Sequence, residues 1–434
     1  MLNSTLLKKQ GKPNSICIDY KPAISLYSIL SLLNRSKGYT EARFNDLTIR
    51  SAFQPIYSVS HQRIVGYEAL ARINDQNRKR INPSQFFTSL EDEYELVLAD
   101  RLCRCLHLDS FAKIDDPINW IFINISPKVA TVGRKYGTFF KALIEDSGIS
   151  ANRVVVEIVE HEESELDQLK ETVNYFRDLG CLIAIDDFGS GYSNFERVWS
   201  LKPDIIKLDQ SMIQQASTIA EIRNLLPGIV SLLHQSGALV LIEGVENRDQ
   251  AMISLESDAD FAQGFFFCRP IANKDQVPDN KNIFDHLFKR YVDSTQKKSR
   301  ANALLIDRYK KTFLDTIVKI KKEIPLSRAC NELFKDRSIV RGYLLKSDGV
   351  QMGETVHCPN RVSEKNLKLK PIQSAEKANW VRRHYVQRAF FNPNQIQITR
   401  PYLSITGAHM CMTLSMLFSS PRGEQVFCCD IDLD

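Results

Sequence analysis

The sequence predicts an α/β protein in which a (β/α)8 barrel is followed by a linker helix and a smaller α+β domain. Short β-branched runs alternate with longer amphipathic segments after residue 50. A long charged helix comes next, and the apolar spacing then changes to that of antiparallel hairpins. The 434 residues are enough for two or three domains, and we expect an N-terminal segment at 1–45, the barrel at 46–275, the linker at 276–325 and the last domain at 326–434.

Seven apolar runs in the first part of the chain have the composition of buried strands. They are 63–68, 120–125, 154–159, 182–186, 205–208, 239–243 and 261–267. Strands that alternate with helices at this interval indicate parallel βα units, and seven or eight units in about 230 residues fit a closed barrel. A doubly wound open sheet is the alternative, but no glycine-rich dinucleotide loop follows the first run.

The segment 276–325 predicts a charged helix with one apolar stripe. The stripe residues recur at three and four positions, and Pro325 ends the helix; they are Leu305, Tyr309, Phe313, Ile317, Ile320 and Ile324. Such a stripe must be buried on one of the domains or against the same helix of a second copy in a dimer. We therefore predict a homodimer that uses the linker helix, the barrel or both.

The last domain has the pattern of antiparallel strands. The run 342–349 ends in an Asp-Gly turn, and the runs 408–418 and 425–431 are separated by Pro421-Arg422-Gly423, which indicates a hairpin. Basic residues exceed acidic ones here, but they are spread along the chain without an arginine-rich arm or a reader motif. We therefore expect no nucleic-acid polymer as a partner.

Composition excludes several other classes of protein. No apolar run approaches the roughly 20 residues of a membrane span, and 23–33 is too short and too polar for a convincing signal peptide. The 10 cysteines are scattered without CxxC spacing, which argues against a disulfide scaffold. These features predict buried thiols and a cytoplasmic location.

Polar residues interrupt the predicted strands at or near their carboxyl ends. They are Glu68, Asn124, Glu157, Asp186, Asp187, Lys207, Glu243 and Gln263. In a barrel these ends converge on one face. Because two carboxylates about 4 Å apart repel by about 4 kcal/mol at an effective dielectric near 20, such a cluster needs raised pKa values or divalent cations. An all-oxygen set without histidine favours Mg²⁺ or Mn²⁺ over zinc, and it has enough acids for two ions.

A series of motifs gives the stretch 46–275 a family resemblance. They are Gln54-Pro55-Ile56, Glu68-Ala69-Leu70 with Arg72, Asn124-Ile-Ser-Pro127, Glu157-Ile-Val-Glu160, Asp186-Asp-Phe-Gly-Ser-Gly-Tyr-Ser193, Lys207-Leu-Asp209, Glu243-Gly-Val-Glu246 and Gln263-Gly264 through Arg269-Pro270. In this order the stretch resembles the EAL-domain family, phosphodiesterases that cleave cyclic di-GMP. The resemblance implies a TIM-like barrel and a substrate of that class.

The resemblance also implies a role for each matching residue. One metal would be held by Glu68, Asn124, Glu157 and Asp186, and the other by Asp186, Asp187 and Glu243. Lys207 would orient or deprotonate the attacking water, Glu160 would brace the loop after Asp186, and Glu68 and Glu243 complete the catalytic set. Candidate substrate-binding residues are Gln54, Arg72, Gln263 and Asp209, although Asp209 could simply form a salt bridge. Phe265, Phe266 and Phe267 are interpreted as barrel filling.

The resemblance, together with the complete set of matching residues, implies a cyclic di-GMP phosphodiesterase that opens the ring to linear pGpG with two Mg²⁺ or Mn²⁺ ions. The chemistry fits, because two metals supply both a nucleophile at neutral pH and neutralisation of phosphoryl charge. The alternative is a slow or inactive cyclic di-GMP receptor that signals to a protein partner.

The C-terminal part resembles PAS-like or Cache-like sensory modules. The matching segments are 343–351, 380–385, 400–404 and 425–432. The resemblance implies that a small ligand with an amino or carboxyl group could contact Trp380, Arg383, Tyr385, Tyr402 and Asp430, and that the domain regulates the barrel. Core or dimer packing is the alternative for each of these residues.

Overall fold

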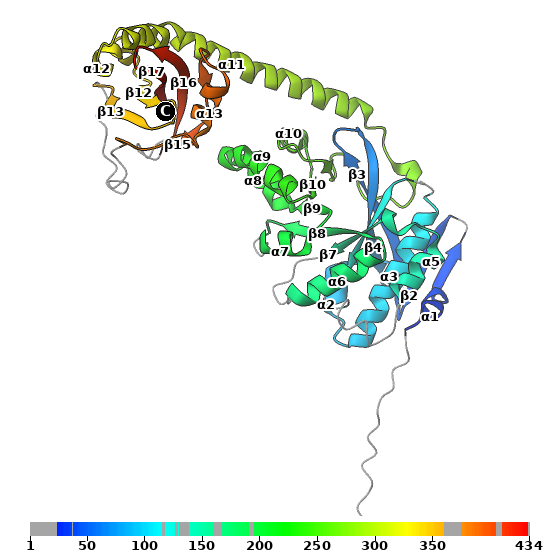
Figure 1. Cartoon of the computed structure of the whole chain (residues 1–434). Coiled ribbons are helices and arrows are strands. Elements are labelled where there is room, and N and C mark those ends of the chain that lie inside the picture. The colour runs from blue at the N-terminus through cyan, green and yellow to red at the C-terminus, as the bar shows by residue number, and fades with distance from the viewer. Residues whose placement is uncertain are drawn as a thin grey trace, which may run out of the picture. The chain divides into compact units, whose positions relative to one another are not determined.

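The computed structural model describes residues 24–36, 38–114, 118–125, 129, 139–158, 166–190, 195–359, 375–404 and 410–432. The chain divides into two compact units, Met1–Tyr291 and Val292–Asp434 (Figure 1). The division falls within the long helix α11 (Lys281–Lys321), so the segment predicted as a linker contributes to both units. Among the described residues, no helix combines the length and apolar composition that crossing a bilayer requires.

A closed barrel forms the centre of the first unit. Around the ring the strands are β3 (Leu47–Ser58), β4 (Arg63–Asn74), β6 (Trp120–Ile125), β7 (Val154–Ile158), β8 (Leu182–Phe188), β9 (Ile205–Leu208), β10 (Leu239–Ile242) and β11 (Phe261–Ala262). Neighbours from β4 to β11 are parallel, and β3 closes the ring by pairing with both β4 and β11. The predicted barrel is therefore confirmed.

Strand β3 differs from the parallel pattern that the sequence predicts. It runs antiparallel to both neighbours, because a short turn joins it to β4 as a hairpin. The apolar pattern places the first strand at 63–68 and misses β3. Its second half, Ala52 to Ser58, is buried on both faces, so the alternation of a half-exposed strand is absent, and Pro55 is unusual within a strand.

Helices surround the barrel, and short strands extend its sheet. The helices are α1 (Leu26–Leu30), α2 (Pro83–Thr88), α3 (Glu93–Ala112), α5 (Phe140–Ser147), α6 (Leu166–Asp178), α7 (Phe195–Leu201), α8 (Gln210–Thr218), α9 (Ala220–Gln235) and α10 (Arg248–Glu256). β1 (Leu33–Ser36) and β2 (Tyr39–Phe44) continue from β3, and β5 (Arg80–Ile81) pairs with β4. The main core lies between these helices and the strands.

The second unit is an antiparallel sheet with helices on its faces. Its strand order is β13 (Gln351–His357), β12 (Ile339–Lys346), β17 (Gly423–Asp432), β16 (Met410–Ser420) and β14 (Gln397–Ile398), with β15 (Tyr402–Leu403) beside β16. The predicted hairpin is β16–β17. The helices are the second part of α11, α12 (Leu326–Ala329) and α13 (His384–Phe391).

The apolar stripe of α11 is buried within the second unit. Tyr309, Phe313, Ile317 and Ile320 form one core with residues of β16 and β17, and Phe313 contacts Phe427 at 4.8 Å between ring centroids. Of the two burial partners that the sequence leaves open, the helix therefore packs on a domain. The apolar stripe therefore no longer supports a homodimer, which stays a prediction.

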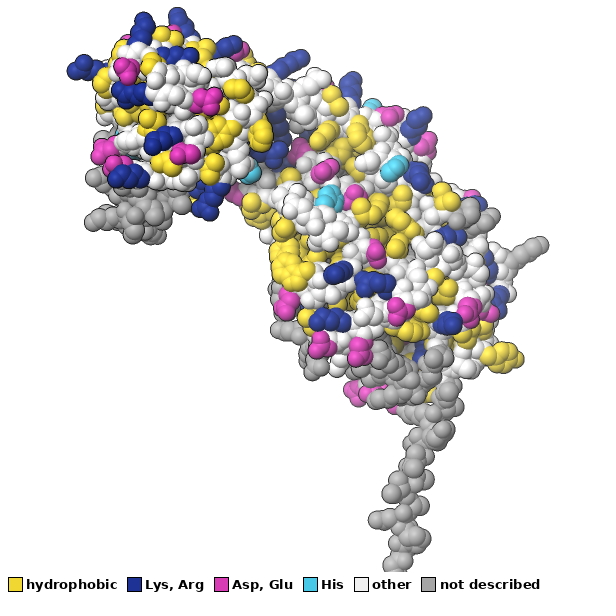
Figure 2. Space-filling model, in the orientation of Figure 1, with side chains coloured by type: hydrophobic (Ala, Val, Ile, Leu, Met, Phe, Trp, Pro, Cys, Tyr) yellow, Lys and Arg dark blue, Asp and Glu magenta, His cyan; other side chains and the backbone are white. Residues whose placement is uncertain are grey.

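The cysteines are buried and the basic side chains are dispersed, as the sequence predicts. The nine cysteines within the described residues are all free and buried. Cys428 and Cys429 point to opposite faces of β17, since they belong to different core clusters. Lys and Arg side chains are spread over the visible face of the second unit and are not gathered in one patch (Figure 2).

Candidate metal centre and substrate pocket

The site residues form one layer of the barrel interior. Ile56, Phe122, Val155, Ala184, Ile205, Leu241 and Phe261, one from each of seven strands, fill the interior below them. Because side chains two positions apart share a face of a strand, the next residues on that face form the layer above. On the parallel strands and the residues just after them, these are Asn124, Glu157, Asp186, Lys207, Glu243 and Gln263.

The two remaining strands complete the layer in the same way. On β4, Glu68 follows Gly66 by two positions. On the antiparallel β3, Gln54 precedes Ile56 by two, and it pairs in register with Glu68. Residues scattered over the chain from Gln54 to Gln263 are therefore neighbours at one face of the barrel.

Lys207 lies at the centre of this layer. Its Nζ is 2.5 Å from Glu157 Oε1, 2.7 Å from Glu243 Oε1, 2.9 Å from Asp186 Oδ1 and 3.9 Å from Glu68 Oε1. The lysine side chain is 1% exposed, and that of Glu157 is fully buried. Five carboxylates, counting Asp187, thus share one ammonium group, and the cluster has an excess of negative charge.

Two amide side chains are also part of the layer. Gln263 Nε2 donates to Glu68 Oε2 at 2.6 Å, and Asn124 Nδ2 donates to Glu68 Oε1 at 3.3 Å. Both oxygens of Glu68 are therefore oriented by neutral donors. Gln263 Oε1 is buried and has no hydrogen-bond partner among the described residues, so it offers a further oxygen to a ligand.

Asp187 reaches the site because the end of β8 is irregular. The β8–β9 register shifts between Ile185 and Phe188, and Asp187 has a left-handed φ of 54°. This bulge breaks the alternation that would turn Asp187 away from Asp186. Carboxylate oxygens of Asp186, Asp187 and Glu243 lie within 4.8 Å of one another, a spacing that could hold a metal ion.

Burial and mutual repulsion change the pKa values of these groups. Burial raises the pKa of Glu243 to about 8 and that of Asp187 to about 6, and in both cases the nearby Asp186 adds to the rise. Burial alone would lower the pKa of Lys207, but the surrounding carboxylates raise it well above its ordinary value. Lys207 is therefore a cation in this arrangement, which suits a hydrogen-bond donor better than a base.

A pocket of about 270 Å³ opens above the layer. Its lining includes the predicted residues Gln54, Glu68, Asp187, Asp209, Glu243 and Gln263. Asp209 also caps α8, since its carboxylate accepts from Ser211 N at 3.0 Å. Five further lining residues were not predicted as site residues; they are Gln210, Gly244, Glu246, Gly264 and Phe265.

Phe265 is not barrel filling, because its side chain is 47% exposed at the pocket, whereas Phe267 is buried. Gly264 permits this placement. A Cβ at Gly264 would lie 2.0 Å from the Val245 carbonyl oxygen, so only glycine lets the two loops approach this closely. The glycine before Phe265 was the available signal in the sequence.

Arg72 is not among the residues that line the pocket. Arg72 lies on the same face of β4 as Glu68, four residues further on, and its Nη1 donates to the Ala71 carbonyl at 3.1 Å. Among the described residues, no carboxylate forms an ion pair with its half-buried guanidinium. Glu160 lies outside the described residues.

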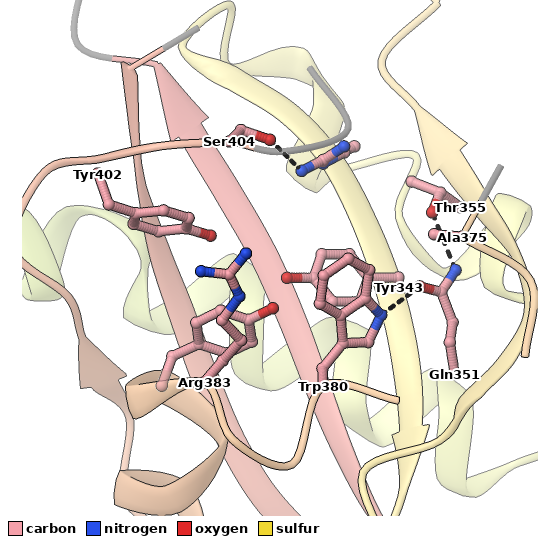
Figure 3. Close-up of a pocket in the computed structure, with 10 residues that line it drawn as sticks. Tyr343, Gln351, Thr355, Ala375, Trp380, Arg383, Tyr402 and Ser404 are labelled. Carbon is pink, nitrogen blue, oxygen red and sulfur yellow. Dashed lines mark hydrogen bonds between the residues drawn. The ribbon is translucent and has the colours of Figure 1, made fainter. Parts of the chain in front are cut away.

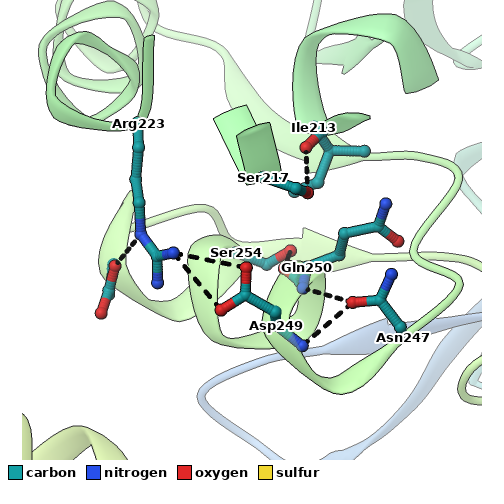
Figure 4. Close-up of polar contacts among 8 residues, drawn as sticks. Ile213, Ser217, Arg223, Asn247, Asp249, Gln250 and Ser254 are labelled. Atoms are coloured by element: carbon teal, nitrogen blue, oxygen red, sulfur yellow. Dashed lines mark hydrogen bonds and ion pairs between the residues drawn. The ribbon is translucent and has the colours of Figure 1, made fainter. Parts of the chain in front are cut away.

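A hydrogen-bonded cluster behind the pocket supports the Glu243–Glu246 loop (Figure 4). Gln250 Oε1 accepts from Glu246 N at 2.7 Å, and Asn247 caps α10 by accepting from Asp249 N and Gln250 N at 3.0 Å each. Arg223 of α9 ties this helix down through Asp249 at 3.3 Å and Glu256 at 2.9 Å. These contacts fix the residues that follow β10.

Comparison with known proteins identifies the barrel. A family model described as the EAL domain matches residues 41–270, more than half of the chain. The chain belongs to the EAL-domain family. The EAL barrel thus coincides with the strands that carry the carboxylate layer.

Two relatives are similar to this chain over different lengths, and the first of them extends beyond the EAL domain. YkuI of Bacillus subtilis, an uncharacterized EAL-domain protein, is 25% identical over 393 residues, which cover 86% of this chain and 92% of YkuI. The crystal structure of YkuI in complex with substrate c-di-GMP and calcium has a TM-score of 0.75 at 22% identity, and the match covers 89% of this chain and 96% of that one. Both units of the EAL protein therefore have the fold seen in YkuI.

The second relative matches the EAL domain alone. The cyclic di-GMP phosphodiesterase RocR of Pseudomonas aeruginosa is 30% identical over 227 residues, which cover 50% of this chain and 56% of RocR. The chain thus spans about half the length of RocR.

The sensory-ligand residues predicted in the second unit of the EAL protein are mostly neighbours. Trp380, Arg383, Tyr385 and Tyr402 line one pocket (Figure 3). Asp430 lies beneath it, fully buried, and is paired with Arg341 at 2.6 Å. Arg341, Tyr343, Gln351 and Ser404 also line the pocket and were not predicted.

Proposed function

We propose that this protein is a metal-dependent phosphodiesterase that hydrolyses cyclic di-GMP to linear pGpG. Membership of the EAL-domain family, the name of RocR and the c-di-GMP and calcium bound to YkuI support this substrate and the need for a divalent cation. The observation that carries the proposal is the cluster of five carboxylates around Lys207 at the mouth of the barrel.

The donor set fits two divalent cations of the Mg²⁺ or Mn²⁺ type. It consists of carboxylate and amide oxygens, without histidine or cysteine, and its negative charge exceeds what Lys207 can balance. One cation would be held by Glu68, Asn124, Glu157 and Asp186, and the other by Asp186, Asp187 and Glu243. When bound, such a pair lowers the pKa of bound water and neutralises charge on the phosphoryl oxygens.

The residues of the chain itself would bind and orient the reactants. Lys207, held as an ammonium group by its carboxylates, would donate to the attacking water and fix its direction. Arg72, which lacks a carboxylate partner in the described structure, would grip a phosphate through its planar fork. Gln54, Asp209, Gln263 and the exposed ring of Phe265 would contact the nucleotide from the pocket wall.

Other parts of the proposal concern assembly and control. Glu160 would brace the loop after Asp186. A PAS-like or Cache-like second unit would adjust turnover in response to a small ligand. The protein would act in the cytoplasm as a homodimer.

Product analysis tests the proposed activity. Purified full-length protein is incubated with cyclic di-GMP and Mg²⁺ or Mn²⁺, and the nucleotides are separated by chromatography. We expect linear pGpG in the presence of either metal and none with a chelator. Tight binding of cyclic di-GMP without any pGpG would contradict the enzyme and favour the receptor.

A further inference from the structure

We infer that the start of α11 supports the proposed active site, and that Asn280 and Phe284 are positioning residues for it. Asn280 immediately precedes α11, and Phe284 belongs to its first turn. Both act through the pocket segment, defined here as residues 263–268, which follows β11. This role rests on the proposed phosphodiesterase for its kinetic consequences, whereas the contacts that define it all lie within the first unit.

The pocket segment contributes to two parts of the site. Gln263 Nε2 donates to Glu68 Oε2 at 2.6 Å, so it orients one of the proposed metal ligands. Two residues later, the side chain of Phe265 is exposed at the wall of the pocket. A displacement of the pocket segment would therefore change the carboxylate layer and the pocket wall together.

Strands and loops of the barrel hold the chain on either side of Phe267. Phe266 N donates to the Val245 carbonyl at 2.9 Å, in the loop after β10. Further on, Ile271 exchanges two backbone hydrogen bonds with Phe53 of β3, at 2.7 and 2.8 Å. The described residues between these two anchors, 267–270, belong to no helix or strand. Their position therefore depends on what packs against them.

Phe267 is held by a cluster of three buried rings. Its ring is stacked on that of Phe284, with 5.5 Å between the centroids and 16° between the planes. Tyr57 of β3 completes the cluster, with its ring centroid 5.3 Å from that of Phe267 and 5.9 Å from that of Phe284. Each of the three residues is at most 3% exposed. Because aromatic pairs add to the stabilisation from burial, the cluster joins the pocket segment firmly to α11 and β3.

Asn280 holds the backbone of the same residue. Its Nδ2 donates to the Phe267 carbonyl at 3.0 Å, and the residue is buried. Its own carbonyl accepts from Ile283 N at 3.0 Å and from Phe284 N at 3.1 Å, so it is also part of the first turn of α11. A buried amide is unfavourable without a partner, and the pocket segment provides that partner. The start of α11 thus fixes both the ring and the backbone of Phe267.

These contacts decide which phenylalanine of the run 265–267 is buried. Three consecutive apolar rings compete for burial, since each would gain from leaving water. Phe284 and Asn280 select Phe267, which leaves Phe265 at the pocket. There the guanidinium carbon of Arg269 lies 4.4 Å from the centre of the Phe265 ring. Without the start of α11, the choice between the rings would be weaker and the pocket wall less defined.

Hydrogen exchange of F284L tests the role of Phe284 independently of turnover. This variant removes the stacked ring and keeps an apolar side chain. F176L is the matched control, because Phe176 packs against Phe140 at 4.9 Å between ring centroids, on a different pair of helices. Exchange in peptides that cover residues 263–268 should be faster in F284L than in F176L by about threefold or more, since an aromatic contact that stabilises this segment is lost.

Kinetics test whether this loosening reaches the site. In F284L, kcat/KM for cyclic di-GMP should fall about tenfold, because a small displacement of positioning groups has a large effect on rate. KM should rise and kcat should fall, since Phe265 contacts the nucleotide and Gln263 orients Glu68. F176L should stay within about twofold of the wild type, because its contacts are independent of the pocket segment.

Two further variants examine the contacts of Phe267 directly. N280D keeps the size of the side chain and the preference for a helix start, but its carboxylate cannot donate to the Phe267 carbonyl. It should change exchange and kinetics in the same direction as F284L. In an F267L background, F284L should cause less than about a twofold further loss of kcat/KM, because both substitutions remove the same ring contact.

Three results would overturn the inference. They are equal exchange of residues 263–268 in F284L and F176L, unchanged kcat and KM in both F284L and N280D, and a full additional loss when F284L is combined with F267L. Absence of pGpG with the wild type would instead contradict the proposed function, and exchange together with Mn²⁺ affinity, expected to be weaker in F284L than in F176L, would then decide the positioning role. If circular dichroism shows that F284L does not fold, N280D is compared with F176L by the same measurements.

Discussion

Lys207 of the barrel and Arg341 of the second unit are both buried cations, but the carboxylates around them differ in number. Lys207 has four carboxylate groups within 3.9 Å, whereas Arg341 is paired with Asp430. A buried ion pair whose groups are also held by hydrogen bonds can serve as structure. A cluster with several acids for one base is incomplete, and it gains most when cations bind.

The comparison also separates the two pockets by the charge of the side chains that line them. The barrel pocket is lined by five acidic residues and no basic one among its described residues, and this lining attracts cations. The described lining of the pocket in the second unit contains two arginines and no acid, and one of these arginines, Arg341, is paired with the buried Asp430. Charge balance within a buried cluster, more than the number of charged residues, therefore indicates what the cluster is for.

The largest effect is expected from E68Q, which removes a charge from the barrel cluster while keeping the shape of the side chain. We expect turnover of cyclic di-GMP to fall by at least about a hundredfold, because a proposed metal ligand is weakened. D167N is the control, since Asp167 belongs to an exposed ion pair with Lys170 on α6, and its turnover should match the wild type. Near-normal turnover by E68Q would remove Glu68 from the ligand set.

The second largest effect is expected from R341M, which tests whether the Arg341–Asp430 pair is structural. It leaves the buried Asp430 without its cation, and the free energy of unfolding of the second unit should fall by about 3–5 kcal/mol. The double variant R341M/D430L should recover much of this loss, because no uncompensated charge remains. Calorimetry and denaturant unfolding measure the free energy of unfolding of both variants. A loss below about 1 kcal/mol for R341M would show that the pair is not a structural unit.

Addition of metal should affect the two units unequally. Mg²⁺ or Mn²⁺ at about 100 times its dissociation constant should stabilise the barrel by about 2.7 kcal/mol. Hydrogen exchange should slow in β7 to β10 and stay unchanged in β16 and β17, and a chelator should reverse the effect. Equal protection of both units would contradict the distinction between an incomplete and a complete cluster.

A smaller effect is expected behind the barrel pocket. N247A removes the cap of α10, and the free energy of unfolding should fall by about 1 kcal/mol. Turnover should fall only modestly, because the cap supports the Glu243–Glu246 loop without contacting the substrate. The matched variant R223Q removes a partly exposed bridge and should cost at most about 1 kcal/mol. A larger loss of turnover in R223Q than in N247A would show that α9 positions the loop.

Local patterns in the sequence were enough to predict the barrel and its polar layer. Glu157, Asp186 and Lys207 lie near the ends of apolar runs, and strand alternation together with the geometry of a barrel predicts that they meet on one face. β3 was missed because its buried half has no alternation, and the role of Phe265 was missed because exposure of one ring in an aromatic run depends on Gly264. Arg341 was missed for another reason: its partner Asp430 is 89 residues away, and pairing at that distance is set by the sheet register.

The most direct test of the central claim is a crystal structure of the protein grown with Mn²⁺ and measured with anomalous scattering at the manganese edge. The charge imbalance around Lys207 predicts two peaks within the carboxylate layer, one beside Glu68 and Glu157 and one beside Asp187 and Glu243, with Asp186 between them. An empty layer at saturating Mn²⁺, with Lys207 still in contact with its four carboxylates, would contradict the claim that this cluster is built to hold cations.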